Sequence, residues 1–140
     1  MVTRADFLTG SNKKTEYYSD FATSFAKTPF GDQLSKVTNE KSINQSIKNL
    51  ILTNQGERLF QPNIGSDIMT MLFEPNYRDY FDQIIMLVKN TIDVNEPRAN
   101  LLDVQINSPV DEHTVEITLI YQVINKPDEI SLTLVFKRVR

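Results

Sequence analysis

The fold of this chain is decided by residues 39–75, which read NEKSINQSIKNLILTNQGERLFQPNIGSDIMTMLFEP. This stretch predicts a helix, a turn marked by two glycines and a proline, and a second, shorter helix. The second helix must end before Pro75, because proline disfavours helical backbone angles in the residue that precedes it. No set of catalytic side chains lies in the stretch, which favours a rigid part of an assembly over an active site.

The first helix is predicted for residues 40–53. Asn39 is a favourable N-cap residue, and Glu40 lies in the first turn, where the helix dipole favours an anion. Gly56 follows as the expected C-terminal stop. The apolar residues recur with the helical period and predict one buried face, made of Ile43, Ile47, Leu50 and Ile51.

Two further helices follow. The second begins near Ser66 and Asp67, which form another capping pair, and the third runs from Asn76 to about Val94. Their apolar stripes predict core positions, because burial of one face stabilises most such helices. These positions are Ile68, Met71 and Leu72 in the second helix, and Phe81, Ile84, Ile85, Val88 and Ile92 in the third.

After Asn95 the apolar residues alternate with polar ones, which predicts three strands of an antiparallel meander. One face packs on the helices and the other faces water. The expected inward residues are Leu102, Val104 and Ile106; Val115, Ile117, Leu119, Tyr121 and Val123; and Ile130, Leu132, Leu134 and Phe136. The fold class is therefore α+β, with three helices packed on one face of an antiparallel sheet. A short hairpin formed by residues 20–26 and 33–37, joined by the turn 28–32, is predicted before the first helix.

A single domain is expected over residues 20–140, because a chain of 140 residues is long enough to bury one core. Residues 1–19 mix polar residues with a glycine and show no period, so we interpret them as an extended N-terminal arm that is ordered against a partner. A frayed terminus is the alternative, since chain ends are often disordered.

Composition argues against several classes of partner. The formal net charge is −3 and the pI is about 5.1, whereas proteins that bind nucleic acid usually carry a basic face. The chain has no cysteine, so disulfides, thiolate catalysis and zinc–thiolate sites are excluded. No apolar run approaches the ~20 residues of a membrane span, and no signal peptide is recognisable. We expect a soluble protein with neither nucleic acid nor a membrane as its partner.

Candidate catalytic residues are few. His113 is the only histidine and stands beside acidic residues in a predicted loop, so we interpret it as exposed. No metal-ligand spacing and no glycine-rich phosphate loop occurs, and the sequence predicts no cofactor. A glycosidase needs two carboxylates that flank a cleft, and no spacing selects two among Glu57, Glu74, Glu96 and Asp103. We therefore expect that the protein is not an enzyme.

The last predicted strand has an outer face that carries Thr133, Val135 and Lys137. A strand near a chain end often lies at a sheet edge, where unpaired backbone groups accept a strand from another chain. The terminal Lys-Arg-Val-Arg sequence equally suits the charged blunting that prevents such pairing. Both interpretations stay open.

Two motifs in order give the chain a family resemblance. The first is the run from Ile47 to Thr53 with Gly56-Glu57-Arg58-Leu59-Phe60, Pro62, Gly65 and Leu72-Phe73-Glu74-Pro75. The second is Glu96-Pro97-Arg98, between the third helix and the meander. Together they resemble the baseplate wedge protein family of contractile phage tails, which includes a related component of type VI secretion systems. The resemblance covers residues 20–137.

The resemblance implies a sheath initiator in the tail baseplate of a virion that is assembled in the host cytoplasm. Its implied partners are baseplate wedge proteins, tail sheath subunits and the tail tube, and sheath subunits would join through strand exchange at Thr133, Val135 and Lys137. Glu96, Pro97 and Arg98 would contact the helical core bundle of the wedge. For Glu96 and Arg98, an internal ion pair is the alternative.

Gly56, Glu57, Arg58, Pro62 and Gly65 are assigned to a structural turn, with Glu57 and Arg58 joining it to the sheet or to the second helix. Two other functions stay open beside the phage sheath initiator. One is the type VI secretion component. The other is a peptidoglycan-cleaving, lysozyme-like enzyme, a label that the family has sometimes carried.

Overall fold

The computed structural model describes residues 17–29, 31–72, 74, 81–107, 114–124 and 126–137. These residues form three helices and two antiparallel sheets, which is the predicted α+β class. In chain order the elements are β1 (Ser19–Phe21), β2 (Lys36–Thr38), α1 (Glu40–Leu52), α2 (Ile68–Leu72), α3 (Phe81–Asn95), β3 (Ala99–Asn107), β4 (Thr114–Val123) and β5 (Glu129–Lys137). No helix in this part of the chain is long and apolar enough to cross a membrane.

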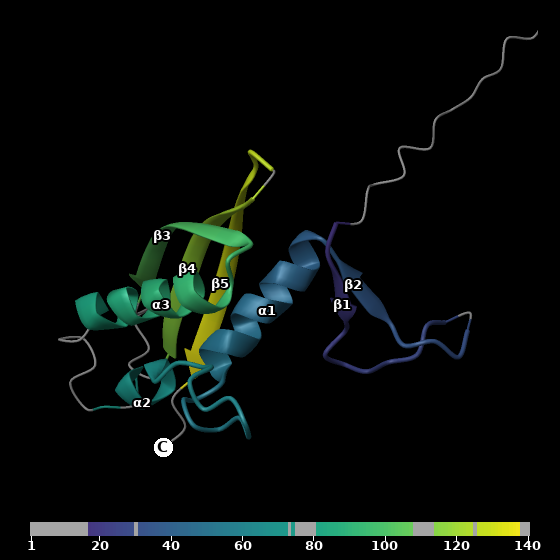
Figure 1. Ribbon diagram of the computed structural model, residues 1–140. Helices are drawn as coiled ribbons and strands as arrows, with labels where there is room; N and C mark the ends of the chain where they lie inside the picture. Colours follow the sequence, from purple (N-terminus) through teal and green to yellow (C-terminus); the bar gives the residue numbers. More distant parts are fainter. Residues whose placement is uncertain are drawn as a thin grey trace, which may run out of the picture.

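The core lies between the helices and one face of the sheet β3-β4-β5, and Figure 1 shows the helices gathered on that side. The predicted apolar stripes are confirmed: each helix buries its expected face, made of Ile43, Ile47 and Ile51 in α1, Ile68 and Leu72 in α2, and Ile84, Val88 and Ile92 in α3. Polar contacts fix α1 over the sheet. The Tyr121 hydroxyl donates to Asn44 Oδ1 at 2.6 Å, and Lys126 Nζ lies 2.6 Å from Glu40 Oε1. Burial raises the pKa of Tyr121 to about 12.

The central strand β4 alternates strictly, and its five predicted inward residues are all buried. In β3 the expectation for Leu102 is wrong, because its side chain is 43% exposed. The register passes from Leu101↔Tyr121 to Asp103↔Ile120, so Leu102 is the extra residue of a β-bulge. A one-residue shift exchanges the two faces of a strand, and the inward face therefore continues from Leu101 to Val104.

The N-terminal hairpin forms a separate two-stranded sheet that projects from the N-terminal end of α1, away from the larger sheet (Figure 1). Its regular pairing is shorter than predicted and joins Ser19↔Thr38 to Phe21↔Lys36, with one isolated bridge between Lys27 and Leu34. The first predicted strand ends early because the Phe25 N–H donates to Ala22 O at 2.9 Å, which closes a turn inside it.

One helix boundary differs from the sequence expectation. Helix α1 ends at Leu52, because Thr53 is extended and its N–H and hydroxyl both donate to Asn49 O. Gly56 lies in the loop beyond, with φ 82°, and is not the helix stop. The predicted start of the third helix at Asn76, the loop histidine His113, most of the N-terminal arm and the three C-terminal residues lie outside the described residues.

Candidate interaction site

The turn between α3 and β3 contains an ion pair between Glu96 and Arg98. Arg98 donates through Nε to Glu96 Oε1 at 2.5 Å and through Nη2 to Oε2 at 2.6 Å. Glu96 is only 2% exposed, whereas about a third of the Arg98 side chain (34%) is exposed. The internal ion pair considered from the sequence is therefore present, and the Arg98 side chain is only partly buried.

Burial and hydrogen bonding act in opposite directions on Glu96. Burial alone would raise the pKa of the carboxyl, but the hydrogen bonds from Arg98 and Ser46 and the Arg98 charge hold that pKa below its ordinary value. The hydrogen bond to Glu96 raises the pKa of Arg98. Both groups are therefore charged at neutral pH, and Glu96 holds the guanidinium in a fixed plane.

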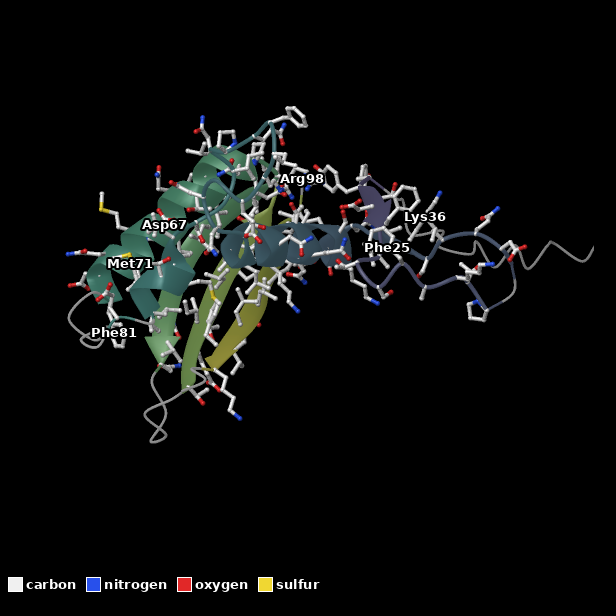
Figure 2. All side chains as sticks on the ribbon, turned by 90° about the horizontal axis from the view of Figure 1, so that it is seen from below. Phe25, Lys36, Asp67, Met71, Phe81 and Arg98 are labelled. Carbon is white, nitrogen blue, oxygen red and sulfur yellow. The ribbon has the colours of Figure 1, made fainter. Side chains whose placement is uncertain are left out.

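Arg98 also contacts the segment that leads into the hairpin. Its Cζ lies 5.4 Å from the centre of the Tyr18 ring, within the range of a cation–π interaction. In Figure 2, Arg98 is placed where the hairpin meets the body, while Phe25 and Lys36 lie out along the hairpin. The ion pair is therefore part of the junction between these two parts of the molecule.

Asn39 fixes the same junction, although not as the N-cap that the sequence predicts. It occupies the N-cap position with φ 52°, and its side chain makes no capping hydrogen bond. Its Oδ1 instead accepts from the N–H groups of Tyr17, at 2.9 Å, and Tyr18, at 3.4 Å, and its own N–H donates to Tyr18 O at 2.7 Å. The expected cap is wrong because the backbone N–H groups of Tyr17 and Tyr18 occupy the side-chain oxygen of Asn39.

Gln45 of α1 continues this attachment along β1. Its Nε2 donates to Phe21 O at 2.7 Å, and its Oε1 accepts from Thr23 N at 3.0 Å. The side-chain amide thereby satisfies one backbone donor and one backbone acceptor of the hairpin. Tyr18, Asn39 and Gln45 are junction residues that sequence reasoning missed, because they act through contacts between residues distant in the chain.

A cavity of about 220 Å³ opens beside the ion pair. It is lined from four elements, by Asp20 of the hairpin, Ser46, Asn49 and Leu50 of α1, Arg58 and Ile64 of the following loop, and Asn95 of α3. The structure therefore brings the first sequence motif, through Arg58, to the region of the second motif. Polar groups dominate this set, which suits a polar partner segment better than an apolar ligand.

The assigned turn residues form a compact loop between α1 and α2. The Gly56 N–H donates to Pro62 O at 2.8 Å, and the Glu57 carboxylate accepts from Asn54 N–H at 3.0 Å. Glu57 is therefore bound within its own loop, and Arg58 lines the cavity together with Ser46 and Asn49 of α1. Gly65 adopts φ 128° with its Cα against the backbone of Thr53, which leaves no room for a Cβ.

Strand β5 lies at an edge of the larger sheet, with Thr133, Val135 and Lys137 exposed on the outer face as expected. The direction of its backbone groups follows from the ladder. The Ile124 N–H donates to Arg98 O, so the backbone groups of Ile124 point toward β3. Successive residues of a strand point their N–H and C=O groups to opposite sides, and β4 has no bulge in its pairing with β5. The backbone N–H and C=O groups of Ile117 and Leu119 therefore point toward β5.

Ile117 and Leu119 pair with Leu134 and Leu132, which therefore point their backbone groups back at β4. Ser131, Thr133 and Val135 alternate with these residues, so their N–H and C=O groups point away from β4. Within the described residues no strand pairs with this side. The edge therefore offers a row of donors and acceptors.

Among the described residues, no group of three or more histidine, cysteine, aspartate or glutamate side chains is placed to hold a metal ion. An open strand edge is a feature to which another protein can add a strand.

Comparison with known proteins shows similarity to components of tail baseplates. The model of the family described as baseplate wedge protein gp25 matches residues 37–128, which include Asn39, Gln45, the loop between α1 and α2 and the Glu96–Arg98 pair but exclude Tyr18 and β5. Baseplate wedge protein gp25 of Enterobacteria phage T4 is 28% identical to this chain over 104 residues, covering 74% of this chain and 79% of the phage protein.

Solved structures share the fold. A crystal structure of a candidate tail lysozyme from Geobacter sulfurreducens has a TM-score of 0.64 and 28% identity, covering 72% of this chain and 92% of that protein. A chain of the anti-feeding prophage baseplate has a TM-score of 0.61 and 20% identity, covering 88% of this chain and 87% of that one. A chain of the post-contraction pyocin R2 baseplate has a TM-score of 0.56 and 20% identity, covering 70% of this chain and 96% of that one.

Proposed function

Because this chain belongs to the baseplate wedge protein gp25 family, we propose that it initiates the sheath of a contractile phage tail from its place in the baseplate. It attaches to the wedge around the tail tube and presents its sheet to the first sheath subunits. The phage T4 relative favours a phage tail over a type VI secretion baseplate. On this proposal the protein is a virion component that is assembled in the host cytoplasm.

The observation that carries the proposal is the open edge of β5. Thr133 and Val135 direct backbone donors and acceptors away from β4, and their side chains are exposed. A strand from another chain that adds to this edge gains main-chain hydrogen bonds without any rearrangement of the core. Lys137 at the end of the strand limits unwanted pairing by its charge.

Wedge attachment is assigned to the turn of Glu96, Pro97 and Arg98. Glu96 is buried and contributes by holding the guanidinium, while the exposed part of Arg98 and the exposed Pro97 meet the partner. Nε and Nη2 are committed to Glu96, so Nη1 is the group that Arg98 offers to a carboxylate or to helix-terminal carbonyls of the wedge core bundle.

A cell-wall hydrolase is the competing function, because one structural neighbour is described as a candidate tail lysozyme. A lysozyme-type general acid needs a pKa raised by its surroundings, whereas the pKa of Glu96 is lowered by Arg98. We therefore propose a purely structural role. Purified protein should leave the turbidity of a cell-wall suspension unchanged, and clearing that disappears in a Glu→Gln variant would contradict this.

Electron microscopy of tails assembled with and without this protein tests sheath initiation. We expect baseplates and tubes that carry no sheath when the protein is missing, and sheathed tails when purified protein is added back. Normal sheath growth without the protein would contradict the proposal.

A further inference from the structure

The larger sheet has two outer strands, β3 and β5, whose outer edges differ in regularity (Figure 1). Strand β5 pairs with β4 without interruption from Glu129 to Lys137, whereas β3 carries the bulge at Leu102. A bulge twists an edge away and disrupts the even spacing that an added strand needs. The β3 edge is therefore the less regular of the two.

The backbone N–H of Val104 lies on the outer side of β3. Val104 pairs with Leu119, whose backbone groups point toward β5, so the N–H and C=O groups of Val104 point away from β4. The Val104 side chain is buried in the core, which fixes this orientation. An unpaired N–H at this place would be available to a strand from another chain.

Asp103 occupies this donor. The Val104 N–H donates to Asp103 Oδ1 at 2.9 Å, and Gln105 Nε2 donates to Asp103 Oδ2 at 3.0 Å, so both carboxylate oxygens are held. At the start of the strand, the Ala99 N–H donates to Glu96 O at 3.1 Å. A strand that adds to β3 would have to break the bond to Asp103 and approach its charge, and charged side chains are a common means of closing a sheet edge.

The hairpin repeats this arrangement at the outer edge of β1. The Ala22 N–H donates to Ser35 O, toward β2, so the backbone groups of Phe21 point to the other side. The Phe21 N–H donates to Asp20 Oδ1 at 2.8 Å, and Phe21 O accepts from Gln45. An aspartate directly before an outward-pointing residue therefore occupies a donor on two edge strands.

Strand β5 lacks this protection. The hydroxyl of Thr133 lies 3.2 Å from that of Thr118 on β4, so it bonds across the sheet and not to its own edge. Within the described residues, no side chain accepts from the outward N–H groups of Ser131, Thr133 or Val135. The donors of this edge are free.

We propose that Asp103 closes the outer edge of β3 to strand addition, so that an added strand is directed to β5. Asp103 acts by occupying a backbone donor, which makes it a residue that determines where a strand can join. The closure of β3 rests on the contacts of Asp103 alone, whereas the identification of the added strand as a sheath strand rests on the proposed function.

Self-association of the isolated protein tests the closure without any sheath. Val135→Pro removes a donor from the β5 edge, and Asp103→Ala in the same chain frees the Val104 N–H on β3. In a symmetric pair of β3 edges each copy contributes one freed donor. We therefore expect the dissociation constant from sedimentation equilibrium to fall by about tenfold relative to Val135→Pro alone. Association that is equally weak or undetectable in both would overturn the proposal.

Asp103→Asn in the same background is the matched control. It removes the same charge but keeps a side-chain oxygen that accepts from the Val104 N–H, so it should associate like Val135→Pro alone. Asp103 is exposed, and melting temperatures close to that of Val135→Pro should show that both variants fold. An equal gain of association in both variants would overturn the role of the hydrogen bond.

Photo-crosslinking in assembled baseplates identifies the edge that the sheath uses. Benzoylphenylalanine is placed at Asn107, exposed on β3, or at Ser131, exposed on β5. The sheath subunit should crosslink to position 131 and not to position 107, and Asp103→Ala should add a crosslink at 107. Equal crosslinking at both positions with Asp103 in place would overturn the proposal. Absence of a sheath crosslink at either position would contradict sheath initiation, and the self-association experiment would still decide the closure of β3.

Discussion

At the scale of single residues, Glu96 is the side chain whose ionisation is coupled most directly to folding. It is buried and its carboxylate is bound in bidentate fashion by Arg98. Glu96→Gln should lower the free energy of unfolding at neutral pH by about 2–3 kcal/mol. Removal of one partner of a buried ion pair costs about 3–5 kcal/mol, and the partial exposure of Arg98 reduces this.

The pH dependence has a defined sign. In the folded protein the pKa of Glu96 is lowered from its ordinary value of 4.5. The ionised carboxylate therefore stabilises the folded state fully at pH values above 4.5. This contribution to the free energy of unfolding is lost as the pH falls toward the lower pKa of the folded state. Urea unfolding of wild-type and Glu96→Gln proteins at several pH values should show a difference that shrinks on acidification. A difference that stays constant with pH would show that the charge of Glu96 does not stabilise the fold.

The two glycines of the loop should respond differently to the same substitution. A Cβ at Gly65 would lie 2.5 Å from Thr53 O and 2.9 Å from Asn54 O, whereas a Cβ at Gly56 would meet nothing within 4 Å. Gly56→Ala should cost about 1–2 kcal/mol through its positive φ alone. Gly65→Ala should cost more than about 3 kcal/mol, because it adds a backbone clash. Chemical denaturation measures both, and equal losses would contradict the role of the close approach.

At the scale of elements, the hairpin depends on a few side-chain amides for its position. Gln45 bonds both Phe21 O and Thr23 N, and the pairing of β1 with β2 is only three residues long. A two-stranded hairpin is marginal without further contacts. Gln45→Ala should therefore increase hydrogen exchange in β1 and β2 by severalfold and leave β4 unchanged. The exposed Lys48 on the same helix provides a control substitution, and equal exchange in Gln45→Ala and wild-type protein would argue against this attachment.

The same elements show how far the sequence determines the fold. Strand β4 and the stripes of α1 and α3 follow from periodicity, because each element buries one face against the same core. The bulge at Leu102 does not follow, since an extra residue is a property of the pairing with β4 and not of β3 alone. The cap at Asn39 fails for a related reason: its oxygen is taken by Tyr17 and Tyr18 from another part of the chain.

The interaction site was accessible to sequence reasoning only in part. Glu96 and Arg98 stand two residues apart, so their pairing could be considered from spacing. The stacking of Arg98 on Tyr18 and the approach of Arg58 to Asn95 join distant segments, and no local pattern indicates them. The exposure of Phe60 is likewise not indicated by a local pattern, because it depends on how the loop presents the side chain.

At the scale of the whole molecule, the helices lie on one face of the sheet β3-β4-β5, and the hairpin extends from the N-terminal end of α1, away from that sheet (Figure 1). Within the described residues no further strand pairs with the outer edge of β5. Attachment and sheath recruitment are therefore proposed at different places on the molecule. The junction residues face the hairpin side, while the free backbone groups of Thr133 and Val135 lie along β5. Variants at these two places should separate the two steps.

Val135→Pro tests the recruitment step. The Val135 N–H points away from β4, so proline at this position removes a donor from the open edge and spares the β4–β5 ladder. We expect a folded protein that enters baseplates normally, together with baseplates that no longer nucleate sheath in electron micrographs. Val135→Thr is the matched control, because it keeps the N–H and the β-branched shape, and it should nucleate sheath like the wild type.

A second proline separates edge recognition from simple loss of structure. Leu134 is 6% exposed and directs its backbone groups toward β4, so Leu134→Pro should break the ladder and lower the melting temperature strongly. Val135→Pro should lower it by far less, although the two positions are neighbours. Normal sheath growth on baseplates carrying Val135→Pro would mean that the sheath strand does not pair with β5, and the other outer strand of this sheet, β3, would then be the edge to test.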